Sequence, residues 1–145
     1  MSDLFVIFRV AESSYVLSAA EVLHMESFTG ATRVPGAARH VVGVVQVRGR
    51  VLPVVDLRMR FGMEALAPGP DTRMVVVQQG KRSVALLADC AREVVRIDPT
   101  LFRSAPEMMG DADQGFVKSV ARVGDRLVMW LDLEKAIGED LTHGH

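Results

Sequence analysis

Short apolar runs separated by turn residues dominate the chain, and few segments have the period of three to four residues that is typical of a helix. Twenty-three of the 145 residues are valine, whose branched side chain favours strands over helices. Helical periodicity is limited to the short segments 56–61 and 133–137. The pattern therefore predicts an all-β protein with short helical turns and a short C-terminal helix. The expected strands are residues 4–10, 14–18, 22–28, 41–47, 51–55, 74–78, 83–88, 93–97, 117–123 and 126–131.

The chain also contains an internal repeat with a constant offset of 76 residues. Residues 44–62 read VVQVRGRVLPVVDLRMRFG, and residues 120–138 read VARVGDRLVMWLDLEKAIG. The Asp-Leu pair is the clearest match between the two segments. Weaker matches extend the repeat towards the N-terminal side of each copy: residues 21–23 with 93–95, and residues 5–8 with 74–77.

This repeat predicts one domain, residues 1–145, built from two similar five-stranded barrels. We expect subdomain 1 to comprise residues 1–66 plus the C-terminal helix, residues 133–140, and subdomain 2 to comprise residues 72–132. The Gly- and Pro-rich segment 63–71 marks the boundary. We expect a groove between the two barrels, where a partner peptide or helix can dock.

Composition narrows the function classes. Apolar residues make up 49% and charged residues 24%, which is typical of a globular chain. The net charge of −1 argues against bulk affinity for nucleic acid or membranes. No apolar run approaches the roughly 20 residues that span a bilayer, and the start Met1-Ser2-Asp3 lacks the features of a signal peptide. We therefore expect a soluble, cytoplasmic protein.

Candidate catalytic groups are few. Asp56 and Asp132 match in the repeat, and a two-lobed aspartyl enzyme would need both carboxylates in one cleft. Each aspartate, however, ends a predicted strand and precedes a helical turn, so we expect it to cap free N–H groups instead. Cys90 is expected to be an inert buried thiol, and His143 and His145 lie in the C-terminal tail. With no phosphate loop, nucleotide motif or metal-ligand cluster, the sequence predicts no enzyme activity, cofactor or metal.

Positive charge is concentrated in residues 33–60, where a single acid, Asp56, accompanies six arginines. These are Arg33, Arg39, Arg48, Arg50, Arg58 and Arg60. Arg48 directly precedes Gly49 at a predicted turn, so it either braces the fold internally or meets an acidic partner. An SH3- or OB-like nucleic-acid binder would use the whole segment, but Phe61 is the one nearby aromatic residue for base stacking.

Several motifs together resemble the CheW family of chemotaxis coupling proteins. They are Arg33-Val34-Pro35, VGVVQVRG at 42–49, VLPVVDL at 51–57, Phe61-Gly62, residues 87–89 and 93–94, RSAPE at 103–107, and DRLVMWLDLEKAI at 125–137, with Phe8, Tyr15 and Val22 upstream. The similarity runs from residue 4 to about residue 137 almost without gaps. The resemblance implies two SH3-like five-stranded barrels around a groove, which agrees with the repeat.

The resemblance also implies a function: a non-enzymatic adaptor between the cytoplasmic tip of a chemoreceptor and the regulatory domain of a CheA-type histidine kinase. By position, Gly43, Arg48 and Val94 match family positions for receptor binding. Val22, His24 and Val42 match family positions for kinase binding. For the three valines, core packing is the competing interpretation.

Five residues depart from the family pattern, and two of them, Val16 and Ser119, each replace a glycine. Gln46 replaces an asparagine, His24 replaces an acid on the third strand, and Val42 replaces a base. The last two changes fall on the expected kinase contact. A divergent paralogue in another chemosensory or pilus-type pathway is therefore the alternative function.

Overall fold

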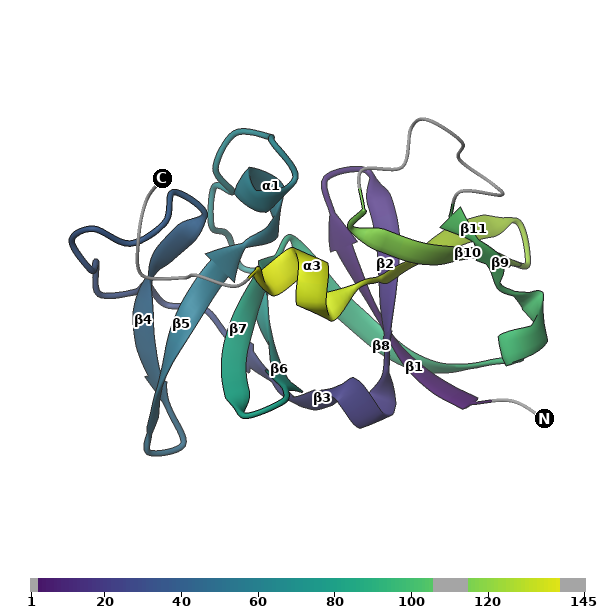
Figure 1. Ribbon diagram of the computed structural model, residues 1–145, viewed down its shortest axis with the longest axis horizontal. Helices are drawn as coiled ribbons and strands as arrows, with labels where there is room; N and C mark the ends of the chain where they lie inside the picture. The colour runs from purple at the N-terminus through teal and green to yellow at the C-terminus, as the bar shows by residue number, and fades with distance from the viewer. Residues whose placement is uncertain (1–2, 106–114, 139–145) are drawn as a thin grey trace.

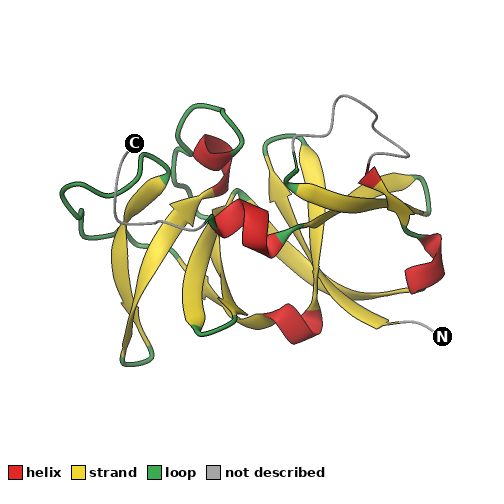
Figure 2. Cartoon of the chain, in the orientation of Figure 1, coloured by secondary structure: helices red, strands yellow, loops and turns green. Residues whose placement is uncertain are grey.

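The computed structural model describes residues 3–105 and 115–138, which form two β-sheets with a few short helices at the ends of strands (Figures 1 and 2). In spatial order, the six-stranded sheet contains β8 (Cys90–Ile97), β1 (Asp3–Val10), β2 (Ser13–Ser18), β11 (Arg126–Leu131), β10 (Val117–Val123) and β9 (Arg103–Ser104). The five-stranded sheet contains β3 (Val22–Ser27), β6 (Arg73–Gln79), β7 (Arg82–Ala88), β5 (Arg50–Asp56) and β4 (Val41–Val47). The helical elements are α1 (Leu57–Arg60), α3 (Leu133–Ile137) and 3-10 turns at Ala19–Glu21 and Pro99–Leu101.

The all-β prediction is confirmed: each expected strand is present, three of them with the expected ends and the others with ends that shift by at most three residues. The two-residue strand β9 was not expected. Of the predicted helix 133–140, the structure describes α3 and Gly138, and residues 139–140 lie outside the described residues. Residues 106–107 of the RSAPE motif and the tail histidines His143 and His145 also lie outside them.

The 76-residue repeat is visible in the architecture. The β4–β5 hairpin followed by α1 corresponds to the β10–β11 hairpin followed by α3, and the two strand orders β3-β6-β7-β5-β4 and β8-β1-β2-β11-β10 match position by position. Each sheet also contains one parallel pair at the same place in this order, β5 with β7 and β11 with β2. The repeat therefore describes two copies of one structural unit.

The expected division of the chain between the barrels is wrong. β1 and β2 pair with strands from the second half of the chain, while β3, β4 and β5 pair with β6 and β7. The chain passes from one sheet to the other at Ala19–Glu21 and again between β7 and β8, whereas the segment 63–71 connects two strands of the same sheet. A repeat identifies segments that are alike, but it does not specify which strand edges form hydrogen bonds with each other.

Buried apolar side chains form three clusters: one on a face of each sheet and one at the junction between the two sheets. Phe5 and Ile7 of β1 belong to a cluster inside the six-stranded sheet, and Met74 and Val76 of β6 to a cluster inside the five-stranded sheet. The alternate residues of the same strands, such as Phe8 and Val75, join a third cluster that contains buried residues of both sheets and of α3. The centre of the junction between the two sheets is therefore packed core.

Candidate functional site

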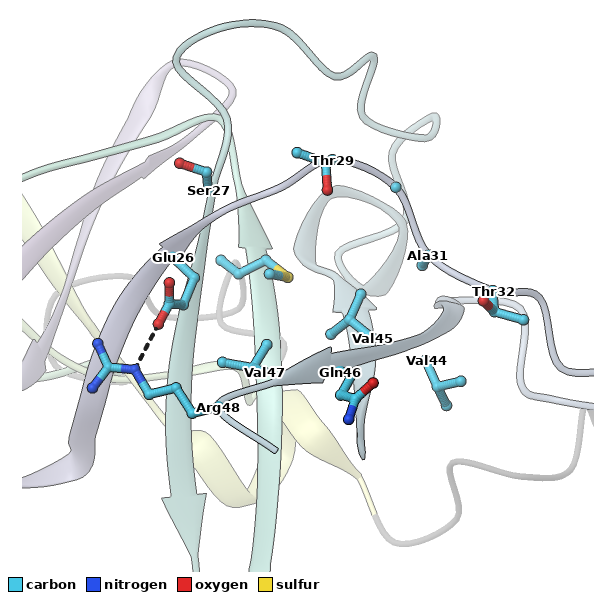
Figure 3. Close-up of a pocket in the computed structure, with 12 residues that line it drawn as sticks. Glu26, Ser27, Thr29, Ala31, Thr32, Val44, Val45, Gln46, Val47 and Arg48 are labelled. Carbon is cyan, nitrogen blue, oxygen red and sulfur yellow. Dashed lines mark hydrogen bonds and ion pairs between the residues drawn. The ribbon is translucent and has the colours of Figure 1, made fainter. Parts of the chain in front are cut away.

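A cavity of about 720 Å³ lies between β3 and β4, the two outer strands of the five-stranded sheet. We call it the seam cavity (Figure 3). Polar residues line most of its rim: Glu26, Ser27, Thr29, Thr32, Gln46 and Arg48. The buried side chains of Met74 and Val47 also line the cavity. β3 and β4 form no strand pair with each other, so the five-stranded sheet is not closed between these two strands.

Arg48 stands at the tip of the β4–β5 hairpin. Val47 pairs with Arg50, so Arg48 and Gly49 form a two-residue turn, and both have positive φ angles of 51° and 80°. Such a turn requires the left-handed region at both positions, where glycine or asparagine is favoured over arginine. Retaining an arginine at a backbone position that disfavours it points to a role for its side chain.

The side chain of Arg48 bridges the open seam. Its Nε donates a hydrogen bond of 3.0 Å to Oε1 of Glu26 on β3, as Figure 3 shows. No described residue accepts a hydrogen bond from its two terminal nitrogens, and the side chain is 68% exposed. Bracing the fold and meeting an acidic partner are therefore compatible roles for Arg48, because one edge of its guanidinium bonds to β3 while the other faces solvent.

Glu26 is a site residue that the sequence analysis missed. It lies two residues after His24 on the same half-buried face of β3, and Oε1 of Glu26 is 3.1 Å from His24 Nδ1, although the geometry does not form a hydrogen bond. An acid is thus present beside the seam even though His24 replaces the acid of the family pattern. Side chains alternate between the two faces of a strand, so residues 24 and 26 share one face. This pattern could have identified Glu26 from the sequence as a neighbour of His24.

Gly43 has a structural explanation. The backbone of Thr32 pairs with Val44 through hydrogen bonds of 2.9 and 2.8 Å, so the chain passes close above β4. A Cβ atom on Gly43 would lie 2.2 Å from the carbonyl oxygen of Thr32. No side chain fits at this position, and the role of Gly43 is to permit this close approach.

The three candidate valines lie in different surroundings. Val22 at the start of β3 is partly buried against the core of the junction, and Val42 on β4 is partly buried against the core of the five-stranded sheet. Val94 is 50% exposed on β8, an edge strand of the other sheet. Arg48 therefore lines the seam cavity together with Glu26. His24 lies beside Glu26 but outside the lining, and Val94 lies on a separate sheet.

The two candidate aspartates are helix caps, as predicted. Asp56 is 1% exposed, and its carboxylate accepts hydrogen bonds from the backbone N–H groups of Arg58, Met59 and Leu66. Asp132 accepts one from Lys135 N at 3.1 Å. Each carboxylate is used to satisfy the first turn of its own helix, which leaves no support for a paired-carboxylate catalytic site.

Other candidate groups also have local explanations. Cys90 was expected to be buried but is only partly buried, because it begins the edge strand β8. Burial, and secondarily the charge of Arg60, lowers the pKa of His40, so its imidazole is neutral at pH 7. Within residues 3–105 and 115–138, no three His, Cys, Asp or Glu side chains lie close enough to hold a metal ion. None of the described helices is long and apolar enough to cross a membrane.

Comparison with known families and structures adds independent information. The family model described as CheW-like domain matches residues 4–140. The chemotaxis protein CheW of Helicobacter pylori is 30% identical over 94% of this chain and 82% of its own length. A probable chemotaxis protein CheW of Rhizobium etli is 26% identical over 91% of this chain and 85% of its own length.

A solved structure is also similar over most of its length. The crystal structure of the scaffolding protein TtCheW from Thermoanaerobacter tengcongensis superposes with a TM-score of 0.83 at 26% identity, covering 91% of this chain and 90% of that one. The similarity therefore extends over both sheets rather than over one of them.

Proposed function

Because the chain belongs to the CheW-like domain family, we propose that it is a non-enzymatic adaptor that couples the cytoplasmic tip of a chemoreceptor to a CheA-type histidine kinase. The structural observation that best supports this proposal is the exposed and anchored side chain of Arg48. Its guanidinium is exposed at a hairpin tip, is held by Glu26 through Nε, and has two terminal nitrogens without a hydrogen-bond acceptor among the described residues. A guanidinium held in this way can donate two parallel hydrogen bonds to a carboxylate.

For the receptor, we propose contacts at Arg48 and Val94. Val94 is half exposed on an edge strand, so it offers apolar area to a helix of the receptor tip. Gly43 acts indirectly by allowing β4 and the segment at Thr32 to approach, which sets the position of the hairpin that ends at Arg48.

For the kinase, we propose contacts along β3 and β4 that include Val22, His24 and Val42. The opposite face of β3 offers further apolar area to a partner, because Leu23 is 45% and Met25 is 38% exposed on this edge strand. Since receptor tips and kinase regulatory domains are cytoplasmic, we propose that the protein acts in the cytoplasm. The alternative, suggested by His24 and Val42 in place of an acid and a base, is a paralogue that serves another chemosensory or pilus-type pathway.

The first test is a pull-down from a lysate of the source organism with this protein as bait. Recovery of a chemoreceptor and a large histidine kinase would support the proposal and name the pathway. Recovery of neither, with the protein folded, would contradict it.

The second test measures binding of the recovered receptor's cytoplasmic fragment. Arg48→Ala should weaken binding by about 1.5–3 kcal/mol, because a charge-assisted hydrogen bond is lost, and Arg48→Lys should restore little of it. Arg122→Ala is the matched control, since Arg122 lies on β10, two residues before the turn residue Gly124 of the corresponding β10–β11 hairpin. Equal binding by the Arg48 and Arg122 variants would contradict the receptor contact.

A further inference from the structure

The arginines of residues 33–60 do not form one basic face. Four of the six are bound to described partners, which leaves Arg33 and Arg39 as two exposed guanidinium groups that pair with no described residue. The four bound arginines are Arg48 with Glu26, Arg50 with Ser83, Arg58 with Asp89, and Arg60 with carbonyl oxygens of α3. Arg33 and Arg39 line the same cavity.

This cavity, which we call the end cavity, has a volume of about 600 Å³ and lies where β3, β5 and β7 end and β4 begins. Its walls include Phe28, Val42, Leu66 and Leu87, and the last two belong to the buried core of the five-stranded sheet. An apolar side chain that enters it would therefore contact core residues directly, and removal of its surface from water would favour binding.

The charge presented by the end cavity is positive. One acid, Asp56, lines it, but this residue is 1% exposed and both carboxylate oxygens accept backbone hydrogen bonds. The free groups at the rim are the two guanidiniums. A ligand with an apolar group and an adjacent carboxylate would complement both the walls and the rim.

We propose that the end cavity binds a short peptide segment of a protein partner in which an apolar residue is flanked by Asp or Glu. The apolar side chain enters between Val42 and Leu66, and the carboxylate accepts hydrogen bonds from Arg33 and Arg39. A single-stranded nucleic acid fits less well, because Phe28 is the one aromatic residue in the lining and bases require stacking partners. The end cavity shares Val42 with the proposed kinase contact, but the proposal does not rest on the adaptor function, because its test uses neither a chemoreceptor nor a kinase.

The test is selection of a random heptapeptide phage library on the full-length protein, followed by affinity measurements on the selected peptides by fluorescence anisotropy. The selected peptides should share an apolar residue next to Asp or Glu. The Arg33→Gln/Arg39→Gln variant should bind them at least ~10-fold more weakly, because both charged donors are lost. The matched control is Arg96→Gln/Arg103→Gln, which removes two exposed arginines of the six-stranded sheet and should change affinity less than about twofold.

A second pair of variants tests the cavity itself. Ala65→Trp fills the end cavity from its exposed wall and should abolish peptide binding, whereas Ala67→Trp, exposed two residues away and not part of the lining, should not. Melting curves of both variants establish that they are folded, and a folded Ala65→Trp variant that binds normally would overturn the proposal.

Three further results would overturn it. Selected peptides without the acidic–apolar pattern would remove the chemical basis of the proposal. Competition by a single-stranded oligonucleotide that depends on Arg33 and Arg39 would assign the cavity to nucleic acid. Tighter peptide binding after deletion of residues 139–145, which contain Glu139-Asp140-Leu141, would make the chain's own C-terminal segment the occupant.

Discussion

Arg60 and Ala136 occupy the same position in the two copies of the repeat, and Nε of Arg60 donates a hydrogen bond of 3.0 Å to the carbonyl oxygen of Ala136. Nη2 of Arg60 donates another, of 2.9 Å, to the carbonyl oxygen of Lys135. The last carbonyls of a helix have no partner within the helix, so Arg60 of α1 satisfies the end of α3. α1 directly follows β5 of the five-stranded sheet, and α3 directly follows β11 of the six-stranded sheet. The contact between the two helices therefore links the two sheets.

Arg60→Ala should lower the free energy of unfolding by about 1–2 kcal/mol, because two charge-assisted hydrogen bonds to α3 are lost. Urea denaturation followed by the fluorescence of Trp130, the single tryptophan, measures this change. Arg33→Ala removes an exposed arginine without a described partner and should be neutral. Equal unfolding curves for the two variants would show that the contact between α1 and α3 contributes nothing to stability.

Arg48→Gly should be at least as stable as the wild type, because glycine relieves the cost of a positive φ, about 1 kcal/mol, while the exposed ion pair to Glu26 contributes less than about 1 kcal/mol. Arg48→Ala keeps the backbone cost and should be slightly destabilised. Thermal melting of both variants checks this order. A large loss of stability in Arg48→Gly would contradict this prediction and would show that the ion pair to Glu26 stabilises the fold more than an exposed pair ordinarily does.

Gly43→Ala should lower the free energy of unfolding by about 2–4 kcal/mol, because its Cβ would overlap the carbonyl oxygen of Thr32 and force β4 away from it. Gly69→Ala is the control, since a Cβ at that position meets no atom within 4 Å. Chemical denaturation of the two variants provides the comparison. If Gly43→Ala is as stable as Gly69→Ala, the segment at Thr32 moves freely and the steric explanation of Gly43 is wrong.

Asp89 should make stability dependent on acid pH. Burial alone would raise the pKa of this carboxyl, but hydrogen bonds from Arg58 and from Ala11 N, with the charges of Arg58 and Arg9, outweigh burial and hold the pKa below its ordinary value. A carboxyl with a lowered pKa in the folded state contributes stability above the unfolded pKa of about 4, and this stability is lost as the pH falls through the folded value.

Asp89→Asn should therefore melt at a lower temperature than the wild type at pH 7, and the difference should shrink as the pH falls below about 4. Melting temperatures across the acid range provide the measurement. Asp71→Asn, at an exposed turn, should follow the wild type throughout. A constant difference between Asp89→Asn and the wild type at every pH would mean that the charge of Asp89 does not contribute.

Much of the local structure follows from the sequence alone. The valine-rich runs predict the strands because a branched side chain loses rotamer freedom in a helix and packs well on the pleated surface of a sheet. Asp56 and Asp132 were predictable as caps, because a cap bonds to N–H groups two or three residues away. The 76-residue repeat likewise predicts that each copy contains a hairpin followed by a short helix, because similar sequences have similar preferences for strand, turn and helix.

Tertiary structure alone decides which strands pair. Every strand edge presents the same N–H and C=O groups, so the local sequence does not specify that β1 and β2 pair with β8 and β11 rather than with the strands of their own half. The pairing of Glu26 with Arg48 depends on closing the five-stranded sheet until β3 faces β4. The end cavity forms in the same way, because Phe28, Val42 and Leu87 are far apart in sequence and meet only where four strands share one end of the sheet.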